Sequence, residues 1–256
     1  MWKTIRIIVL LFILATVAQG AWLAQRDATS WKDPVIVALY PINADGSERT
    51  EQYVRGIDLE RLQPIAEFMR EQATIYGVAV NDPIERRLAP RIDARPPQPP
   101  ADGGVVSAIV WSLSFRFWAW RHDTYTGARA NVRLFLLYHD DRRSPRLPHS
   151  TGLEKGLIGL VNVFASDEMA GTNNVVIAHE MLHTLGATDK YDLATNLPLF
   201  PDGYAEPERM PRVPQQFAEI MGGRIPISLL RADQPAGLHQ VVIGRLTARE
   251  INWIAP

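Results

Sequence analysis

The chain of 256 residues is long enough to form one large domain or two lobes that share a cleft. Its 27 basic and 28 acidic residues give a formal net charge of −1, so no overall electrostatic field favours nucleic acid as a partner. The absence of cysteine excludes disulfides, a thiol nucleophile and a Cys-ligated metal site. Any transition metal must therefore be held by His, Asp, Glu or backbone oxygen.

The N-terminus has the pattern of an export signal. Lys3 and Arg6 precede residues 7–24, which carry no charge, and residues 18–20 (Ala-Gln-Gly) offer a small-x-small cleavage site. At about 1.5 Å per residue, the uncharged segment is also just long enough to cross a hydrocarbon core of roughly 30 Å. We therefore expect residues 1–25 to be a signal peptide or a signal anchor.

An anchor is slightly favoured, because the apolar run continues through Trp22 and Leu23. The bias of basic residues toward the cytoplasm then places the rest of the chain outside it, on the periplasmic or secreted side. Membrane contact is expected only through this N-terminal segment.

The first part of the mature chain predicts a strand, a helix and a second strand. Residues 35–40 are an apolar run bounded by Pro41, which is typical of a strand. Apolar residues at three- and four-residue spacing over 62–76 predict an amphipathic helix, with Pro64 in its first turn. Gly77 ends that helix, and residues 78–80 are interpreted as a second strand.

The middle of the chain predicts further elements of the same kind. Residues 105–120 fit both a strand and a helix pattern, and their length without a breaker favours a helix. Residues 132–138 and 156–164 are apolar, rich in β-branched side chains and bounded by turn residues, so both are predicted to be buried strands.

Residues 171–186 predict the helix on which the function depends. Thr172 or Asn173 is a candidate N-cap, and Gly186 permits a left-handed exit. His179 and His183 are four residues apart, so they lie on one helix face and two imidazoles can converge on one metal ion. Glu180 lies further round the helix, where it can hydrogen-bond a metal-bound water instead of binding the metal.

This His-Glu-x-x-His pattern is that of zinc peptidases. The alternative is a helix that carries two solvated or core histidines. Two imidazoles and a carboxylate suit Zn²⁺, although other divalent metals are compatible with the same donors.

A third metal ligand is expected just after the helix. Gly186 can turn the chain sharply, so that Asp189 returns toward the metal and leaves one position open to water. Other carboxylates are candidates too: Asp192 as the nearest rival, and Glu206 and Glu219 as more distant ones.

With Gly186 and Asp189 included, the sequence resembles the metzincin clan of zinc peptidases, in its rarer version with Asp as third ligand. The stretch from Asp189 to Asp192 is also similar to immune-inhibitor-type bacterial peptidases. The segment around Met221, followed by two glycines, resembles the Met-turn of that clan. The clan's frequent Tyr two residues after this Met is replaced by Gly223, so a transition-state phenol must come from elsewhere, with Tyr191 or Tyr204 as candidates.

The resemblance implies an α+β, zincin-like fold in one metallopeptidase domain, residues 33–256. A mixed twisted sheet and the active-site helix form an upper lobe, about 33–186. An irregular lower lobe, about 187–256, holds the Met-turn and a C-terminal helix that begins with Thr247 as its cap. The resemblance also implies that a strand beside the cleft binds the substrate backbone, and residues 156–164 are best placed by order for this role.

The expected function is that of an extracytoplasmic zinc metallopeptidase with a polypeptide substrate. Zn²⁺ is bound by His179, His183 and Asp189, Glu180 is the general base, and Met221 is structural. Two alternatives remain: a catalytically inactive metal-binding or interaction module on the same scaffold, and a zinc hydrolase that acts on a non-peptide amide.

Overall fold

The centre of the fold is a mixed five-stranded sheet. The computed structural model describes residues 2–100 and 104–255. Four strands run parallel and the fifth, at one edge, is antiparallel to its neighbour. The order across the sheet is β2 (Ile84–Leu88), β1 (Val35–Asn43), β3 (Val132–His139), β5 (Ile158–Phe164) and β4 (Thr151–Leu153). The prediction of a mixed sheet is confirmed.

The predictions for β1, β3 and β5 are confirmed, whereas the predicted strand at residues 78–80 is wrong. Gly77 has a φ of 68°, and the Val78 N–H donates 3.0 Å to the carbonyl of Ala73. Val78 thus closes the end of the preceding helix, so its N–H is not available to a sheet. The second strand of the chain begins only at Ile84.

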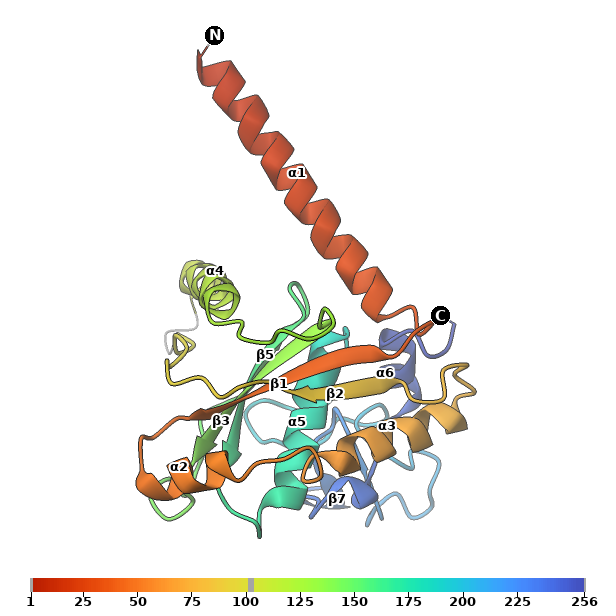
Figure 1. Ribbon diagram of the computed structural model, residues 1–256. Coiled ribbons are helices and arrows are strands. Elements are labelled where there is room, and N and C mark those ends of the chain that lie inside the picture. Colours follow the sequence, from red (N-terminus) through yellow and green to blue (C-terminus); the bar gives the residue numbers. More distant parts are fainter. Residues whose placement is uncertain (1, 101–103, 256) are drawn as a thin grey trace.

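Helices cover both faces of the sheet (Figure 1). α4 (Val105–Arg121) lies on one face; α2 (Glu48–Arg55), α3 (Gln63–Ile75) and α5 (Ala170–Thr184) lie on the other. Alternate side chains of β1 enter the two resulting cores: Val37 and Leu39 face α3 and α5, while Ala38 and Tyr40 face α4. The helical interpretation of residues 105–120 is therefore confirmed.

The N-terminal helix α1 (Trp2–Ala28) projects from this body (Figure 1). Just beyond its end, Trp31 donates from Nε1 to the Ile251 carbonyl and packs edge-on against Trp253 at 5.6 Å. Within the part of the chain that the structure describes, no helix combines the length and apolarity needed to cross a membrane. The export signal stays a prediction.

The lower lobe is irregular, with short elements. Its strands form two pairs, one parallel and one antiparallel, and its last helix ends near the C-terminus. The elements are β6 (Ala218–Glu219), β7 (Ile225–Ser228), β8 (Arg231–Asp233), η1 (Leu238–Gln240), β9 (Val241–Val242) and α6 (Arg245–Glu250). The terminal helix was predicted to start at Thr247, but Thr247 lies inside α6 and its hydroxyl donates to buried Glu219 instead of capping the helix.

Candidate metal centre

α5 carries the three residues of the zinc-peptidase pattern. It begins at Ala170, so Thr172 and Asn173 lie within its first turn and the prediction that one of them caps it is wrong. The Asn173 side chain instead bonds to both backbone groups of Phe164, at 2.9 and 2.8 Å. The Asn173 amide therefore fixes α5 against β5. Because it bonds to Phe164, it does not compete for the backbone groups of its own helix.

α5 ends at Thr184, and the predicted left-handed exit follows at Gly186, whose φ is 106°. The Ala187 N–H donates 3.0 Å to the Leu182 carbonyl, and the Gly186 N–H donates 3.2 Å to that of His183. This pair of bonds closes the helix and turns the chain back beneath it. A side chain with a Cβ is strained at this φ, so glycine suits the turn.

The structure brings His179, His183 and Asp189 together. The Nε2 atoms of the two histidines are 3.1 Å apart, and Asp189 Oδ1 lies 3.1 Å from each of them. Donors that bind one zinc ion tetrahedrally at about 2.0–2.1 Å are themselves about 3.3 Å apart. The three atoms therefore have the spacing that a single small cation requires.

Backbone carbonyls set the orientation of both imidazoles. His179 Nδ1 donates to the Ile220 carbonyl at 2.9 Å, and His183 Nδ1 donates to the Ala187 carbonyl at 2.8 Å. When the Nδ1 atom carries the proton, the Nε2 lone pair of each neutral ring points at the shared centre. Two lone pairs and a carboxylate oxygen facing one point repel one another unless a proton or a metal cation lies between them, and these donor types fit a divalent metal.

The electrostatics of the three residues support this fit. Burial acts to lower the pKa of His179, but the bond with Asp189 and the charge of Glu180 outweigh it and raise the pKa to about 9. Partial burial likewise opposes ionisation of Asp189, yet hydrogen bonds with both histidines hold its pKa well below the usual range. The centre therefore stabilises positive charge.

Glu180 lies beside this centre. Among the described residues, its ligand atoms and those of the two histidines lie within 4.8 Å of one another. The side chain is buried, and no described residue forms a hydrogen bond of normal geometry with its Oε2 atom, although the Gly152 backbone lies close enough to act on the pKa of the carboxyl. The pKa of Glu180 is raised above its ordinary value, because the effect of burial outweighs the charges of the two histidines, which act to lower it. An unpartnered buried carboxylate oxygen at this place is suited to take a proton from a water at the centre.

The edge strand β4 approaches α5 closely at Gly152. A Cβ added to Gly152 would lie 2.5 Å from the His183 Cβ and 2.6 Å from the Glu180 carbonyl. Only glycine therefore allows β4 to pack directly against the helix turn that carries these side chains. Neither β4 nor this close approach was predicted from the sequence.

The loop that presents Asp189 is held by Glu250 of α6. Glu250 accepts hydrogen bonds from the Thr188 hydroxyl at 2.6 Å and the Thr188 N–H at 3.1 Å. It also pairs with the Lys190 ammonium at 2.7 Å. The residues before and after Asp189 are thus both fixed by one carboxylate, and no local pattern around residue 250 predicts this contact.

The rival carboxylates are occupied elsewhere. Asp192 Oδ1 accepts bonds from the backbone of Ala194 and from Thr195, so it closes a local turn. Glu206 pairs with Arg209 at 3.2 Å. Of the four candidates for third ligand, Asp189 lies against the histidines, while each rival has a structural partner.

The remaining rival, Glu219, organises the turn at Met221. One of its oxygens accepts the N–H groups of Met221 and Gly222, at 2.7 and 2.8 Å. The other accepts the Gly244 N–H at 2.9 Å and the Thr247 hydroxyl at 2.7 Å. Because the Ile220 carbonyl accepts the His179 ring proton, this buried carboxylate supports the tautomer of a candidate ligand.

Tyr191 and Tyr204 occupy different places. The Tyr191 ring lies 6.3 Å from that of His179 and lines the cleft. Burial, followed by the charges of Asp189 and Glu180, raises its pKa to about 12, so the phenol keeps its proton at neutral pH. Tyr204 is buried and packs edge-on against Phe200. Of these two tyrosines, Tyr191 is the one placed to donate a hydrogen bond at the centre.

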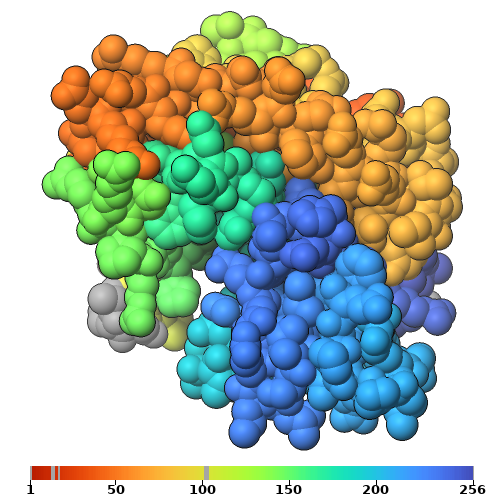
Figure 2. Space-filling model, turned by 90° about the horizontal axis from the view of Figure 1, so that it is seen from below, coloured from red at the N-terminus to blue at the C-terminus, as the bar shows by residue number. Residues whose placement is uncertain are grey.

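The centre opens into a cleft of about 810 Å³ between the two lobes. Seen from below, a recess separates the green segment that precedes β4 from the cyan and blue lower lobe (Figure 2). Residues 156–164, which were expected to bind the substrate backbone beside the cleft, do not lie at the sheet edge, because β4 pairs with residues 158–160 of β5 and the Asn162 N–H donates to the Ser150 hydroxyl. The sheet edge is β4.

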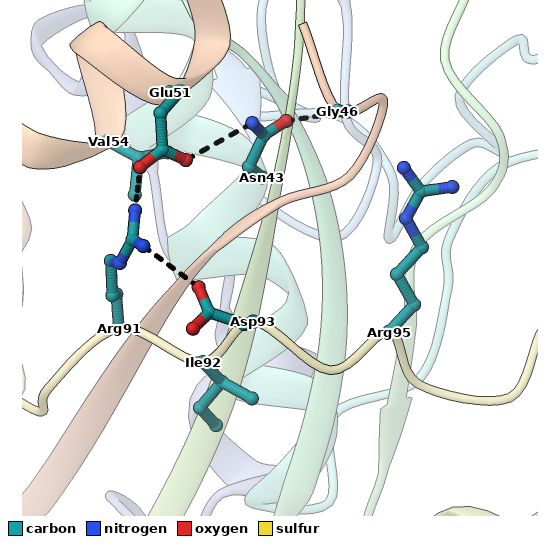
Figure 3. A pocket seen from close by; sticks show the side chains of 8 residues that line it. All are labelled: Asn43, Gly46, Glu51, Val54, Arg91, Ile92, Asp93 and Arg95. Atoms are coloured by element: carbon teal, nitrogen blue, oxygen red, sulfur yellow. Dashed lines mark hydrogen bonds and ion pairs between the residues drawn. The ribbon is translucent and has the colours of Figure 1, made fainter. Parts of the chain in front are cut away.

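A smaller hollow of about 170 Å³ lies between the end of β1 and α2 (Figure 3). Glu51 bonds to Arg91 and to Asn43, and Arg91 also pairs with Asp93 at 3.0 Å. Arg95 stands apart from these pairs in the close-up (Figure 3). Because most of its charges pair with one another, we interpret this hollow as an ion-pair cluster that joins α2 to the segment after β2.

No protein-family model matches the chain, and no curated protein matches it. Any proposal about function therefore rests on the geometry of the centre.

Proposed function

We propose that this protein is a zinc-dependent peptidase, with His179, His183 and Asp189 as zinc ligands and Glu180 as general base. The observation that supports this most is the convergence of two Nε2 atoms and one carboxylate oxygen at 3.1 Å separations. Beside them lies a buried glutamate with a free oxygen. A site for metal storage needs the ligands alone, whereas hydrolysis also needs such a base.

The roles of the side chains follow from their positions. His179, His183 and Asp189 would hold the zinc ion, which would supply a Lewis acid able to acidify a water and to polarise the substrate carbonyl. Glu180 removes the proton from the attacking water and passes it to the leaving amine. Tyr191 donates a hydrogen bond to the oxygen on which negative charge develops.

The substrate backbone is proposed to add to the sheet along β4. This strand is at the edge, it borders the helix turn of Glu180 and His183, and its outer side has no strand partner in the described sheet. An extended peptide bound there by main-chain hydrogen bonds brings a peptide bond to the centre. This arrangement of upper sheet, helix and lower turn is why we favour a metzincin-like fold.

We also propose that the enzyme acts outside the cytoplasm. The proposal is supported by the basic residues and uncharged segment at the N-terminus.

Glu180→Gln tests the function. It keeps the shape and the metal ligands but removes the base, so we expect stoichiometric zinc with hydrolysis of a mixed peptide library reduced by about 100-fold or more. Glu208→Gln, at an exposed glutamate of the lower lobe, is the matched control and should retain full activity. Stoichiometric zinc without peptide hydrolysis in the wild type would favour the inactive module, and cleavage of amides other than peptides would favour the third alternative.

A further inference from the structure

The cleft has an asymmetric set of charges. Its lining includes two arginines, Arg224 on the lower wall and Arg146 on the opposite one, together with His149. Among the described residues that line the cleft, Glu180 is the one carboxylate, and it is buried and assigned to the reaction. A bound cation at the centre adds further positive charge, so anionic groups are favoured throughout the cleft.

Arg224 is the more informative of the two arginines. It has no ion-pair partner within 4.0 Å among the described residues, whereas Arg91, Arg133 and Arg209 each have at least one. Its side chain is partly buried, a setting in which an unpaired guanidinium is costly and an opposite charge is attracted strongly. An arginine in this state is suited to pair with a group that arrives with the substrate.

The fold also fixes the backbone of Arg224 near the reacting centre. Gly222 and Gly223 precede it and have no side chains, so Arg224 is the first side chain after the turn that can extend into the cleft. Ile225 and Pro226 follow as buried residues of β7, which holds the position rigidly. The positive charge of Arg224 acts to lower the pKa of Tyr191, whose ring lies 6.3 Å from that of His179.

We propose that Arg224 is a specificity residue that binds a carboxylate of the polypeptide substrate close to the scissile bond, and that the enzyme therefore prefers acidic peptides. A guanidinium binds a carboxylate through two parallel hydrogen bonds, which selects Asp or Glu over their amides. Arg146 is exposed on the opposite wall and contributes a weaker, longer-range attraction. This inference rests on the proposed function.

The test uses zinc-loaded protein and matched peptide sets in which one position at a time is Glu, Gln or Lys. Peptides with free and with amidated C-termini separate a side-chain carboxylate from a terminal one. We expect kcat/KM to be about 10-fold higher for the Glu peptide at one position near the cut. Arg224→Gln should abolish this preference and Arg224→Glu should invert it toward Lys. Arg231→Gln, whose arginine pairs with Asp233 outside the cleft, is the control.

Binding gives a second readout that does not depend on turnover. In the Glu180→Gln background, the acidic peptide should bind about 10-fold more tightly than its Gln counterpart, and adding Arg224→Gln should remove the difference. Cleavage by the wild type without a charge preference would overturn the proposed role of Arg224 but would support the proposed peptidase activity. Charge-selective binding without any cleavage by the wild type would instead refute the peptidase and leave the carboxylate site.

Discussion

The two lobes hold their parts of the candidate metal centre by different means. In the upper lobe, parallel strands and α5 satisfy their backbone groups in regular ladders, and the helix period alone aligns His179 with His183. The lower lobe has only short strand pairs. There, two carboxylates accept the hydrogen bonds that fix the loops: Glu219 at the turn of Met221, and Glu250 beside Asp189.

The difference shows where the centre is vulnerable. A regular helix distributes its stability over many backbone bonds, so the positions of the two histidines depend on no single side chain. The third ligand and the support of His179 each depend on one buried or half-buried acid. The comparison is tested by changes in the lower lobe that leave the sheet and α5 intact.

The largest effect is expected for Asp189→Ala. Loss of one of three protein ligands should weaken zinc binding on the order of 1,000-fold, measured by competition with a chromogenic chelator. Asp192→Ala is the control, because Asp192 closes a local turn and should change zinc affinity by less than about 3-fold. If Asp192→Ala lost zinc and Asp189→Ala kept it, the ligand assignment would be reversed.

Glu219→Gln should have the next largest effect, on the free energy of unfolding. Each oxygen of Glu219 accepts two hydrogen bonds, so an amide NH₂ at either place faces donors that it cannot satisfy. We expect a loss of about 3 kcal/mol in urea denaturation of the metal-free protein. Exposed Glu71→Gln should cost little. A variant as stable as the wild type would show that the turn is held by something other than this carboxylate.

The sequence predicted the central strands β1, β3 and β5 and the helices α3, α4 and α5, because their signals are local. Helix periodicity aligned His179 with His183, and Gly186 marked the turn that leads to Asp189. The same reasoning failed where residues far apart in the chain decide the structure. Thr247 was taken for a helix cap and Glu219 for a rival ligand, yet they bond to each other across 28 positions.

The edge of the sheet was missed for a related reason. β4 has only three residues, too few to show an alternating pattern, and it is fixed by pairing with β5 and by the absence of a side chain at Gly152. Likewise, nothing near residue 250 in the sequence indicates that Glu250 contacts residues 188 and 190. Such contacts follow from packing, which single-sequence patterns do not encode.

Glu250→Gln should give the smallest of the three effects, because it acts on Asp189 only through the residues on either side. Loss of one charged oxygen leaves the buried Lys190 ammonium without its counter-charge, and we expect zinc affinity to fall about 10-fold. Arg249→Gln, at an exposed position of the same helix, should leave affinity unchanged. The contacts of Glu250 with Thr188 and Lys190 form a clamp around Asp189. Unaltered zinc affinity in Glu250→Gln would mean that the loop holds Asp189 without this clamp.

The contribution of the Glu250 clamp to the free energy of unfolding depends on pH in a direction that follows from the pKa of Glu250. Burial acts to raise the pKa of Glu250, but the bonds from Lys190 and Thr188 outweigh it and lower the pKa below that of the unfolded chain. The clamp therefore stabilises the metal-free protein at all pH values above the unfolded pKa of about 4.3 and ceases to do so as the pH falls through the folded value. The stability difference between wild type and Glu250→Gln, measured by urea denaturation, should be constant from about pH 6 to 8 and shrink below about pH 4. A difference that grew on acidification would show that the carboxyl is protonated in the folded state, and the comparison of the lobes would then have to rest on Glu219 alone.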